Sequence, residues 1–210
     1  MKIKIIGFLF LLIANTAFAQ QNEDFKNTKG YFDYQRYLLN QSFKKKFDDT
    51  NDLREKIEIK KTFAEIMVKM DSLQNVEFIN TLIKVKNKES LGIKYKMDNG
   101  QQNLQEGDAI SQNEKPAEYP GGMNELRKQV AELLYYENTN SSSKLLHTEI
   151  TFVVNKTGEI THVNAQGDNP SFNRQAEIAL YLLPEKFSPA IINNQLVNYR
   201  FKMPLSMRLD

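Results

Sequence analysis

The residues near the C-terminus alternate between apolar and polar side chains, and this pattern constrains the fold more than any other. The apolar side chains occupy every odd position: Val197, Tyr199, Phe201, Met203, Leu205, Met207 and Leu209. A period of two is typical of a strand with one buried face, so the stretch predicts a long final strand. Pro204 lies on the polar face and has no N–H to donate, which predicts that this strand lies at a sheet edge.

Four further elements are predicted ahead of the final strand. Apolar residues at helical spacing indicate helices over residues 123–134 and 170–183, and two strands, 150–154 and 160–165, are joined by a short turn ending in Gly158. Within the second of these strands the apolar side chains change from even to odd positions, which predicts a β-bulge. The order helix, strand, strand, helix, strand predicts an α+β fold, with helices on one face of a three-stranded antiparallel sheet.

The N-terminal region carries weaker patterns. Residues 31–47 fit a helix, whereas residues 64–70 alternate between apolar and polar and are followed by a turn over 71–75. This arrangement predicts an N-terminal helix followed by a β-hairpin. Glu65–Asp71 aligns with Glu149–Asn155 and shows the same parity break, which is consistent with a degenerate repeat or with a chance match between two amphipathic hairpins.

Residues 98–118 are the most polar stretch away from the termini and predict a linker. They separate an N-terminal helix and hairpin region, residues 20–97, from a C-terminal domain, residues 119–210. At the start of the chain, residues 1–19 have the basic, apolar and small-residue segments of a secretory signal peptide. The apolar run is shorter than the roughly twenty residues of a spanning helix. We therefore expect cleavage after Ala19 and a periplasmic or exported protein, the alternative being an uncleaved anchor.

Charge and composition exclude several functions. The formal net charge of +2 falls to zero once Lys2 and Lys4 leave with the signal, which argues against nucleic acid or an anionic membrane surface as the main partner. The absence of cysteine excludes disulfides and thiol catalysis. His147 and His162 have no companions at metal-ligand spacing and are expected to be solvated.

No pattern for catalysis is present either. Glu177 and Glu185 are interpreted as solvated helix charges, since the sequence indicates no cleft for a catalytic carboxylate pair. Nucleophile and phosphate-binding motifs are also missing. We expect no catalytic residue, no cofactor and no metal site, and so a protein that is not an enzyme.

Residues 119–210 resemble the C-terminal domain of the TonB family. The matching segments, in order, are Tyr119–Gly122, Phe152–Ile160, Gln175–Ala179, Leu183–Pro189 and the alternating final strand. The chain has six prolines in all, too few for the proline-rich spacer of TonB itself. The resemblance therefore implies the fold and a binding role rather than energy transduction.

In that family the final edge strand receives an extended peptide of an outer-membrane transporter, which adds to the sheet as a further strand. The resemblance implies a similar partner here, with a role in transport across the envelope. The alternative is a structural, self-associating envelope protein without a transporter partner. The expected partner-binding residues are Tyr199, Arg200, Phe201, Lys202, Met203, Pro204, Leu205, Ser206, Met207 and Arg208.

Overall fold

The computed structural model describes residues 2–97, 114–135 and 145–208, with side chains from residue 23 to residue 91 and in the two later ranges. The chain forms two compact units: Asp24–Thr81, and Leu82–Asp210 together with Met1–Glu23. The described residues form four helices and two three-stranded antiparallel sheets, which confirms the predicted α+β class.

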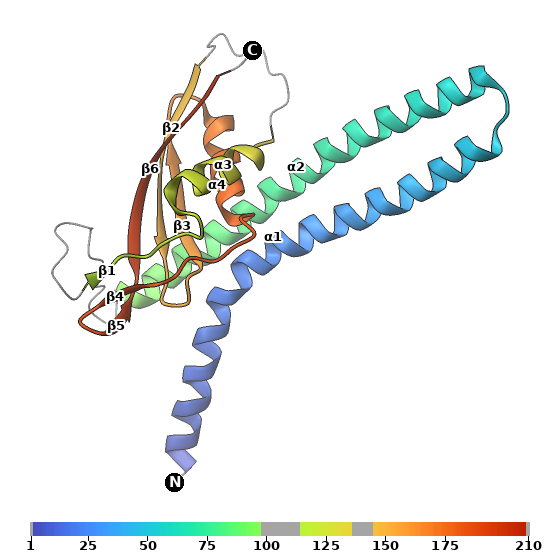
Figure 1. Ribbon diagram of the computed structural model, residues 1–210. Helices are drawn as coiled ribbons and strands as arrows, with labels where there is room; N and C mark the ends of the chain where they lie inside the picture. The colour runs from blue at the N-terminus through green and yellow to red at the C-terminus, as the bar shows by residue number, and fades with distance from the viewer. Residues whose placement is uncertain (1, 98–113, 136–144, 209–210) are drawn as a thin grey trace. The chain divides into compact units, whose positions relative to one another are not determined.

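The unit Asp24–Thr81 is a helical hairpin. It consists of the second half of α1 (Lys2–Asp49) and the first part of α2 (Leu53–Met97), which run antiparallel (Figure 1). Asp52 begins α2, because its carboxylate accepts the N–H of Arg54 at 3.0 Å. The side chains buried along the unit include Phe25, Phe32, Ile59, Met70 and Phe78. The helix predicted over residues 31–47 is thus confirmed within α1.

The predicted N-terminal β-hairpin, and with it the degenerate repeat, is wrong. Residues 64–79 lie inside α2, where Phe63, Met70 and Phe78 recur at helical spacing. Met70 is buried whereas Val68, which the alternation placed on the same face, is 64% exposed. No glycine or proline occurs between residues 51 and 91, and Lys, Glu and Gln favour a helix. Nothing local therefore interrupts α2 at the expected turn.

The main sheet of the other unit has the order β3-β2-β6. Its strands are β2 (Leu145–Val154), β3 (Ile160–Gln166) and β6 (Tyr199–Arg208), while α3 (Gly122–Glu132) and α4 (Pro170–Tyr181) lie on one face (Figure 1). The predicted succession of helix, strand, strand, helix and strand is confirmed. The core between α4 and the sheet includes Ile150, Phe152, Phe172, Leu180 and Met203.

The predicted β-bulge is confirmed. The pairing of β2 with β3 shifts between Thr151 and Val153, which accommodates one extra residue in β3. The extra residue falls at His162, whose φ of 52 lies in the left-handed region. The hairpin turn before it requires Gly158, which has a φ of 79, and a Cβ there would lie 2.0 Å from the Phe187 carbonyl oxygen.

A second sheet, β1-β4-β5, was not predicted. It consists of β1 (Glu114–Lys115), β4 (Ala190–Ile192) and β5 (Gln195–Val197). Glu118 also exchanges two backbone hydrogen bonds with Ser188, of 3.1 and 2.8 Å. The last residues assigned to the linker are therefore part of the folded domain, because their backbone groups pair with the segment after α4. Residues 98–113 of that linker, and Leu209, lie outside the described residues.

Candidate functional site

Strand β6 lies at one edge of the main sheet, as its proline predicted. It pairs with β2 over its whole length, from Tyr199 opposite Val154 to Arg208 opposite Leu145. Strand β3 occupies the other side of β2, and no described strand pairs with the outer side of β6. All ten residues predicted as partner-binding lie in this strand, so the structure brings them together along one edge.

The direction of the β6 backbone groups follows from the hydrogen bonds of β3. Ala165 pairs with Ile150 but donates its N–H to the Glu177 carboxylate, at 2.8 Å. The N–H and C=O groups of Ile150 are therefore directed at β6, because groups of successive residues point to opposite sides of a strand. Met203, opposite Ile150, then bonds to β2, and Pro204 directs its carbonyl outward. The residues that share this outward direction are Arg200, Lys202, Ser206 and Arg208.

The β3 edge is closed by side chains instead of by a strand. Besides the bond from Ala165 to Glu177, the N–H of Val163 is 3.3 Å from the Tyr181 hydroxyl, and the N–H of His162 donates to Glu89 at 2.8 Å. Glu89 belongs to the last turns of α2, within the same compact unit as the sheet. The outward N–H groups at the bulge are thereby occupied, so this edge offers them to no added strand.

The side chains that close β3 are themselves buried. Glu177 also pairs with Lys86 of α2 at 2.7 Å, and its side chain is only 6% exposed. The prediction that Glu177 is a solvated helix charge is therefore wrong, whereas Glu185 is exposed. Burial, reinforced by the Glu89 carboxylate, raises the pKa of Tyr181 well above its ordinary value. Tyr181 thus stays protonated and donates its hydroxyl hydrogen to Glu89 at 3.0 Å.

An aromatic cluster supports β6 from the core side. The Phe201 ring stacks on Phe152 with centroids 5.1 Å apart, and Phe187 and Tyr199 lie 5.3 and 5.1 Å from Phe201. Phe187 belongs to the segment between Pro184 and Pro189 and also contacts Tyr119 at 5.0 Å. These contacts fix the inner face of β6 against the core.

The ring of each histidine lies next to a hydroxyl group. His147 is exposed on β2, and its Nδ1 lies 2.9 Å from the Ser206 hydroxyl, while the ring of His162 lies 3.1 Å from the Thr161 hydroxyl. Within the ranges that the structure describes, no three histidine or acidic side chains are grouped as a metal site would require.

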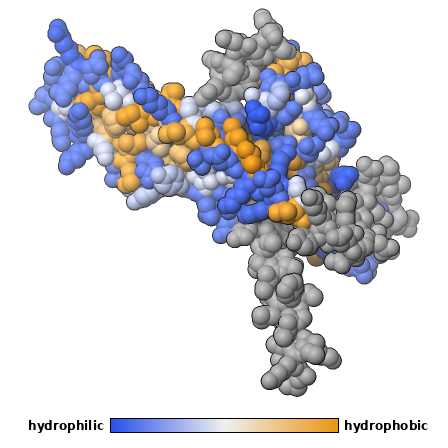
Figure 2. Space-filling view, turned by 180° about the vertical axis from the view of Figure 1, so that it is seen from behind, coloured by the Kyte–Doolittle hydropathy of each residue, from blue (hydrophilic) through white to orange (hydrophobic). Residues whose placement is uncertain are grey.

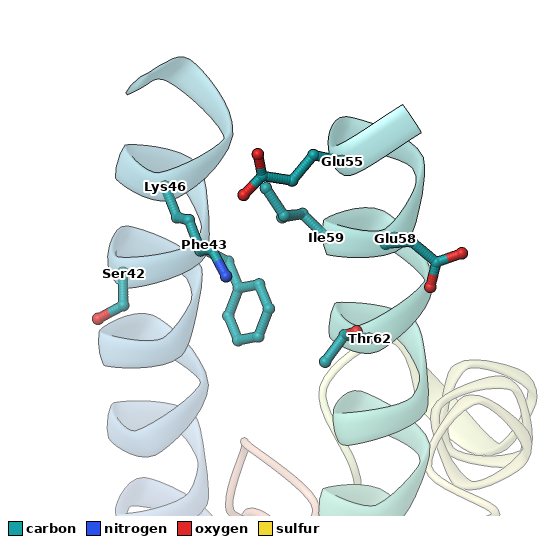
Figure 3. Close-up of a pocket in the computed structure, with 7 residues that line it drawn as sticks. All are labelled: Ser42, Phe43, Lys46, Glu55, Glu58, Ile59 and Thr62. Atoms are coloured by element: carbon teal, nitrogen blue, oxygen red, sulfur yellow. The ribbon is translucent and has the colours of Figure 1, made fainter. Parts of the chain in front are cut away.

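The helical hairpin has a small hollow near its tip, where α1 and α2 are joined. The hollow has a volume of about 270 Å³ and is partly apolar, with Phe43 and Ile59 among its lining residues. Lys46 and Glu55 point into the gap whereas Glu58 points away, so the charged groups do not converge on one position (Figure 3). Such an open, mixed lining does not define a ligand site.

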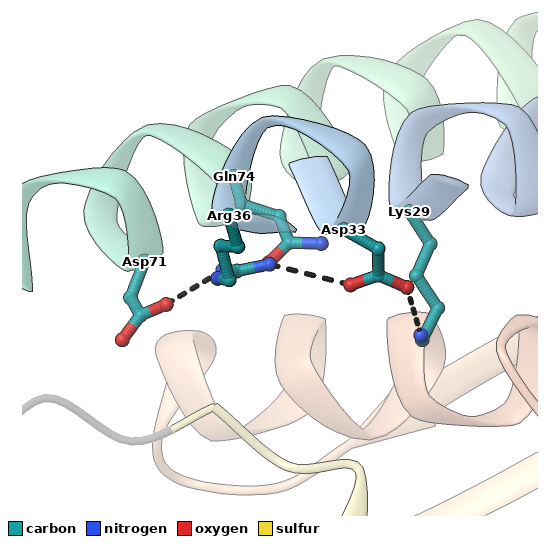
Figure 4. A network of polar contacts seen from close by, with 5 residues as sticks. All are labelled: Lys29, Asp33, Arg36, Asp71 and Gln74. Atoms are coloured by element: carbon teal, nitrogen blue, oxygen red, sulfur yellow. Dashed lines mark hydrogen bonds and ion pairs between the residues drawn. The ribbon is translucent and has the colours of Figure 1, made fainter. Parts of the chain in front are cut away.

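A polar network ties the two helices of the hairpin together. Arg36 of α1 donates to Asp71 of α2 at 2.6 Å, and Asp33 and Lys29 extend the network along α1 (Figure 4). Apolar surface is also present along the hairpin, interspersed with hydrophilic residues (Figure 2). Its large exposed aliphatic side chains include Leu53, Ile57, Val68, Leu73 and Val76.

Among the helices of the described residues, none combines the length and hydrophobicity that crossing a bilayer requires. Comparison of the chain with protein-family models, with curated proteins and with solved structures finds no match.

Proposed function

We propose that the C-terminal domain is a protein-interaction module that binds an extended peptide as a fourth strand on the outer edge of β6. The observation that carries this proposal is the difference between the two edges of the main sheet. Side chains of α2 and α4 occupy the outward N–H groups of β3, whereas the outward groups of β6 meet no described strand. An edge of this kind is a template for strand addition.

The geometry of β6 suits a peptide that is held by its backbone. Outward N–H groups at Arg200, Lys202, Ser206 and Arg208, with the carbonyls of the same residues and of Pro204, alternate along one line. Main-chain hydrogen bonds supply affinity in this mode of binding, and side chains on the two faces supply selectivity. The proposal involves no catalytic step, since the buried acids Glu89 and Glu177 are both engaged in closing β3.

The resemblance of the domain to the TonB C-terminal family indicates the class of partner. We propose a periplasmic protein, released by cleavage after Ala19, that binds a peptide of a TonB-dependent outer-membrane transporter and takes part in transport across the envelope. The alternative is self-association without a transporter. In that case the strand added to β6 would come from a second copy of this chain.

A matched pair of variants at Ser206 tests strand addition. Ser206→Pro removes one outward N–H without touching the bonds to β2, and Ser206→Ala removes the hydroxyl but keeps the N–H. We expect Ser206→Pro, checked for native circular dichroism, to lose capture of envelope transporters in a pull-down that Ser206→Ala retains. Normal folding of Ser206→Pro with undiminished capture would refute strand addition at β6. A wild-type dimer that Ser206→Pro converts to a monomer would favour the self-associating protein.

A further inference from the structure

We infer that the segment added to β6 carries carboxylates at two positions eight residues apart, which meet Arg200 and Arg208 at the two ends of the strand. This inference rests on the proposed strand addition and specifies the chemistry of its partner. It is based on the positive charges on the solvated face of β6, on which of them pair with a described carboxylate, and on the spacing between them.

Three cations lie on the solvated face of β6, and among the described residues one of them has a carboxylate partner. Lys202 pairs with Glu149 of β2 at 3.0 Å. Arg200 and Arg208 are exposed, and neither forms an ion pair with another described residue.

The β2 neighbours of the two arginines explain why they lack partners. Val153 lies opposite Arg200, and Leu145 lies opposite Arg208. Both neighbours are aliphatic and cannot neutralise a guanidinium. The two ends of β6 therefore carry positive charge that the sheet itself leaves uncompensated, with a neutralised or uncharged stretch between them.

An added strand would bring its own side chains next to these arginines. Directly opposite residues of an antiparallel pair have Cβ atoms about 4.5–5.5 Å apart, which is within reach of an arginine and a glutamate or aspartate. The guanidinium group is suited to bidentate pairing with a carboxylate. Because Arg200 and Arg208 share a face, their partners must be an even number of residues apart. In a regular ladder that number is eight, or roughly 27 Å of strand.

The other face of the added strand would meet apolar side chains. Tyr199, Phe201 and Met207 are only partly buried and lie on the core side of β6, next to its open edge. Side chains of the ligand at alternate positions would extend this apolar surface. The partner is therefore an amphipathic extended segment, with apolar residues at every second position and acids at both ends of its polar face.

The same charges argue against a second copy of this chain as the occupant. Antiparallel pairing of two β6 strands centred on Pro204 would place Arg200 of each copy opposite Arg208 of the other. Like charges directly opposite each other destabilise a strand pair. Pro204 would also meet its own counterpart, and neither proline can donate a hydrogen bond.

The probe for this inference is a synthetic eleven-residue peptide in which Val alternates with Thr and two Thr positions, eight residues apart, are replaced by Glu. Its matched control carries Gln at both positions. Binding to the full mature chain is measured by fluorescence anisotropy at low and at physiological salt. We expect the Glu peptide to bind more tightly, by about fivefold for each ion pair at low salt, and the advantage to shrink as salt is added.

Variants of the protein complete the test. Arg200→Gln and Arg208→Gln should each remove about half of the difference between the two peptides on a logarithmic scale, whereas Arg174→Gln, at an exposed position of α4, should leave it unchanged. Equal affinity for the Glu and Gln peptides, with both lost in Ser206→Pro, would overturn the acidic partner and leave strand addition standing. Failure of either peptide to bind the wild type at millimolar concentration would overturn both.

Discussion

Glu177→Ala should destabilise the C-terminal domain much more than removal of a comparable exposed glutamate. Glu177 lies on α4 with its side chain only 6% exposed, and one carboxylate oxygen accepts from both the Ala165 N–H and the Lys86 ammonium. Alanine at this position would leave a buried backbone donor without an acceptor and a lysine without its counter-charge. It would also open space against the sheet.

The expected loss follows from these groups. An orphaned buried donor costs about 1–3 kcal/mol, and the partly solvated Lys86 adds less than a fully buried cation would. We therefore expect Glu177→Ala to lower the free energy of unfolding by about 2–4 kcal/mol. Glu177→Gln keeps an acceptor for Ala165 and should lose about 1 kcal/mol. The control is Glu132→Ala, which removes an exposed pair with Lys128 at 4.0 Å and should change stability by less than about 0.5 kcal/mol.

Urea unfolding at constant m-value measures the stability differences, and hydrogen exchange reports the Ala165 amide directly. In Glu177→Ala that amide should exchange faster, relative to the wild type, than amides in the ladder between β2 and β6. A loss no larger than that of Glu132→Ala, together with unchanged protection of Ala165, would refute the closure of the β3 edge by this carboxylate.

Two further predictions concern Tyr181 and the hairpin turn. Because the folded state raises the pKa of Tyr181, its stabilising contribution is complete below pH 10 and declines above it. Unfolding by urea should accordingly show a loss of up to about 1.4 kcal/mol per pH unit above pH 10, and this component should be absent in Tyr181→Phe. Gly158→Ala should lower stability by more than about 2 kcal/mol, since it combines a positive φ with a backbone clash, whereas Gly30→Ala in open space on α1 should be neutral or stabilising. Equal melting temperatures for these two glycine variants would contradict the turn geometry.

The C-terminal domain could be predicted well because its local patterns agree with its tertiary environment. The alternating sequence of the final strand matches its burial, since one face packs on the core and the other faces solvent. The parity break near His162 marks the bulge because an extra residue reverses which side chains point inward. In each case the information lies within a few residues of the feature.

The prediction of a β-hairpin in the N-terminal region was wrong for a physical reason. Residues 64–70 alternate for too few positions to distinguish a strand from one face of a helix, and the deciding signals lie outside that window. The absence of a breaker before residue 92 favours a long helix. The pairing of Phe43 with Phe63, 5.2 Å apart, depends on the loop that reverses the chain near Asp52. A short window could not contain that information.

The side-chain contacts that close the β3 edge could not be predicted from the sequence either. Glu89 and His162 are far apart in the sequence, and nothing near either residue indicates that they meet. Glu177 gave a faint signal, since it stands among the apolar residues Ala176, Ile178 and Ala179, all of which are buried. An acid within such a run is either at the edge of an apolar stripe or buried with a partner, and only the packed structure distinguishes these two cases.

The two edges of the main sheet pose the same physical problem and meet it in different ways. Every exposed edge invites pairing with other chains, so an edge needs either a cover or a feature that limits which strands can add. At β3 the cover is built from Glu89, Glu177 and Tyr181, which accept the outward N–H groups. At β6 a central proline, and arginines near both ends that pair with no described carboxylate, would disfavour a second β6 strand, while no described strand pairs with the outward backbone groups. The two arginines would attract an added strand that carries carboxylates opposite them, and they would repel a second β6 strand. The same pair of charges can therefore both disfavour self-association and select a partner.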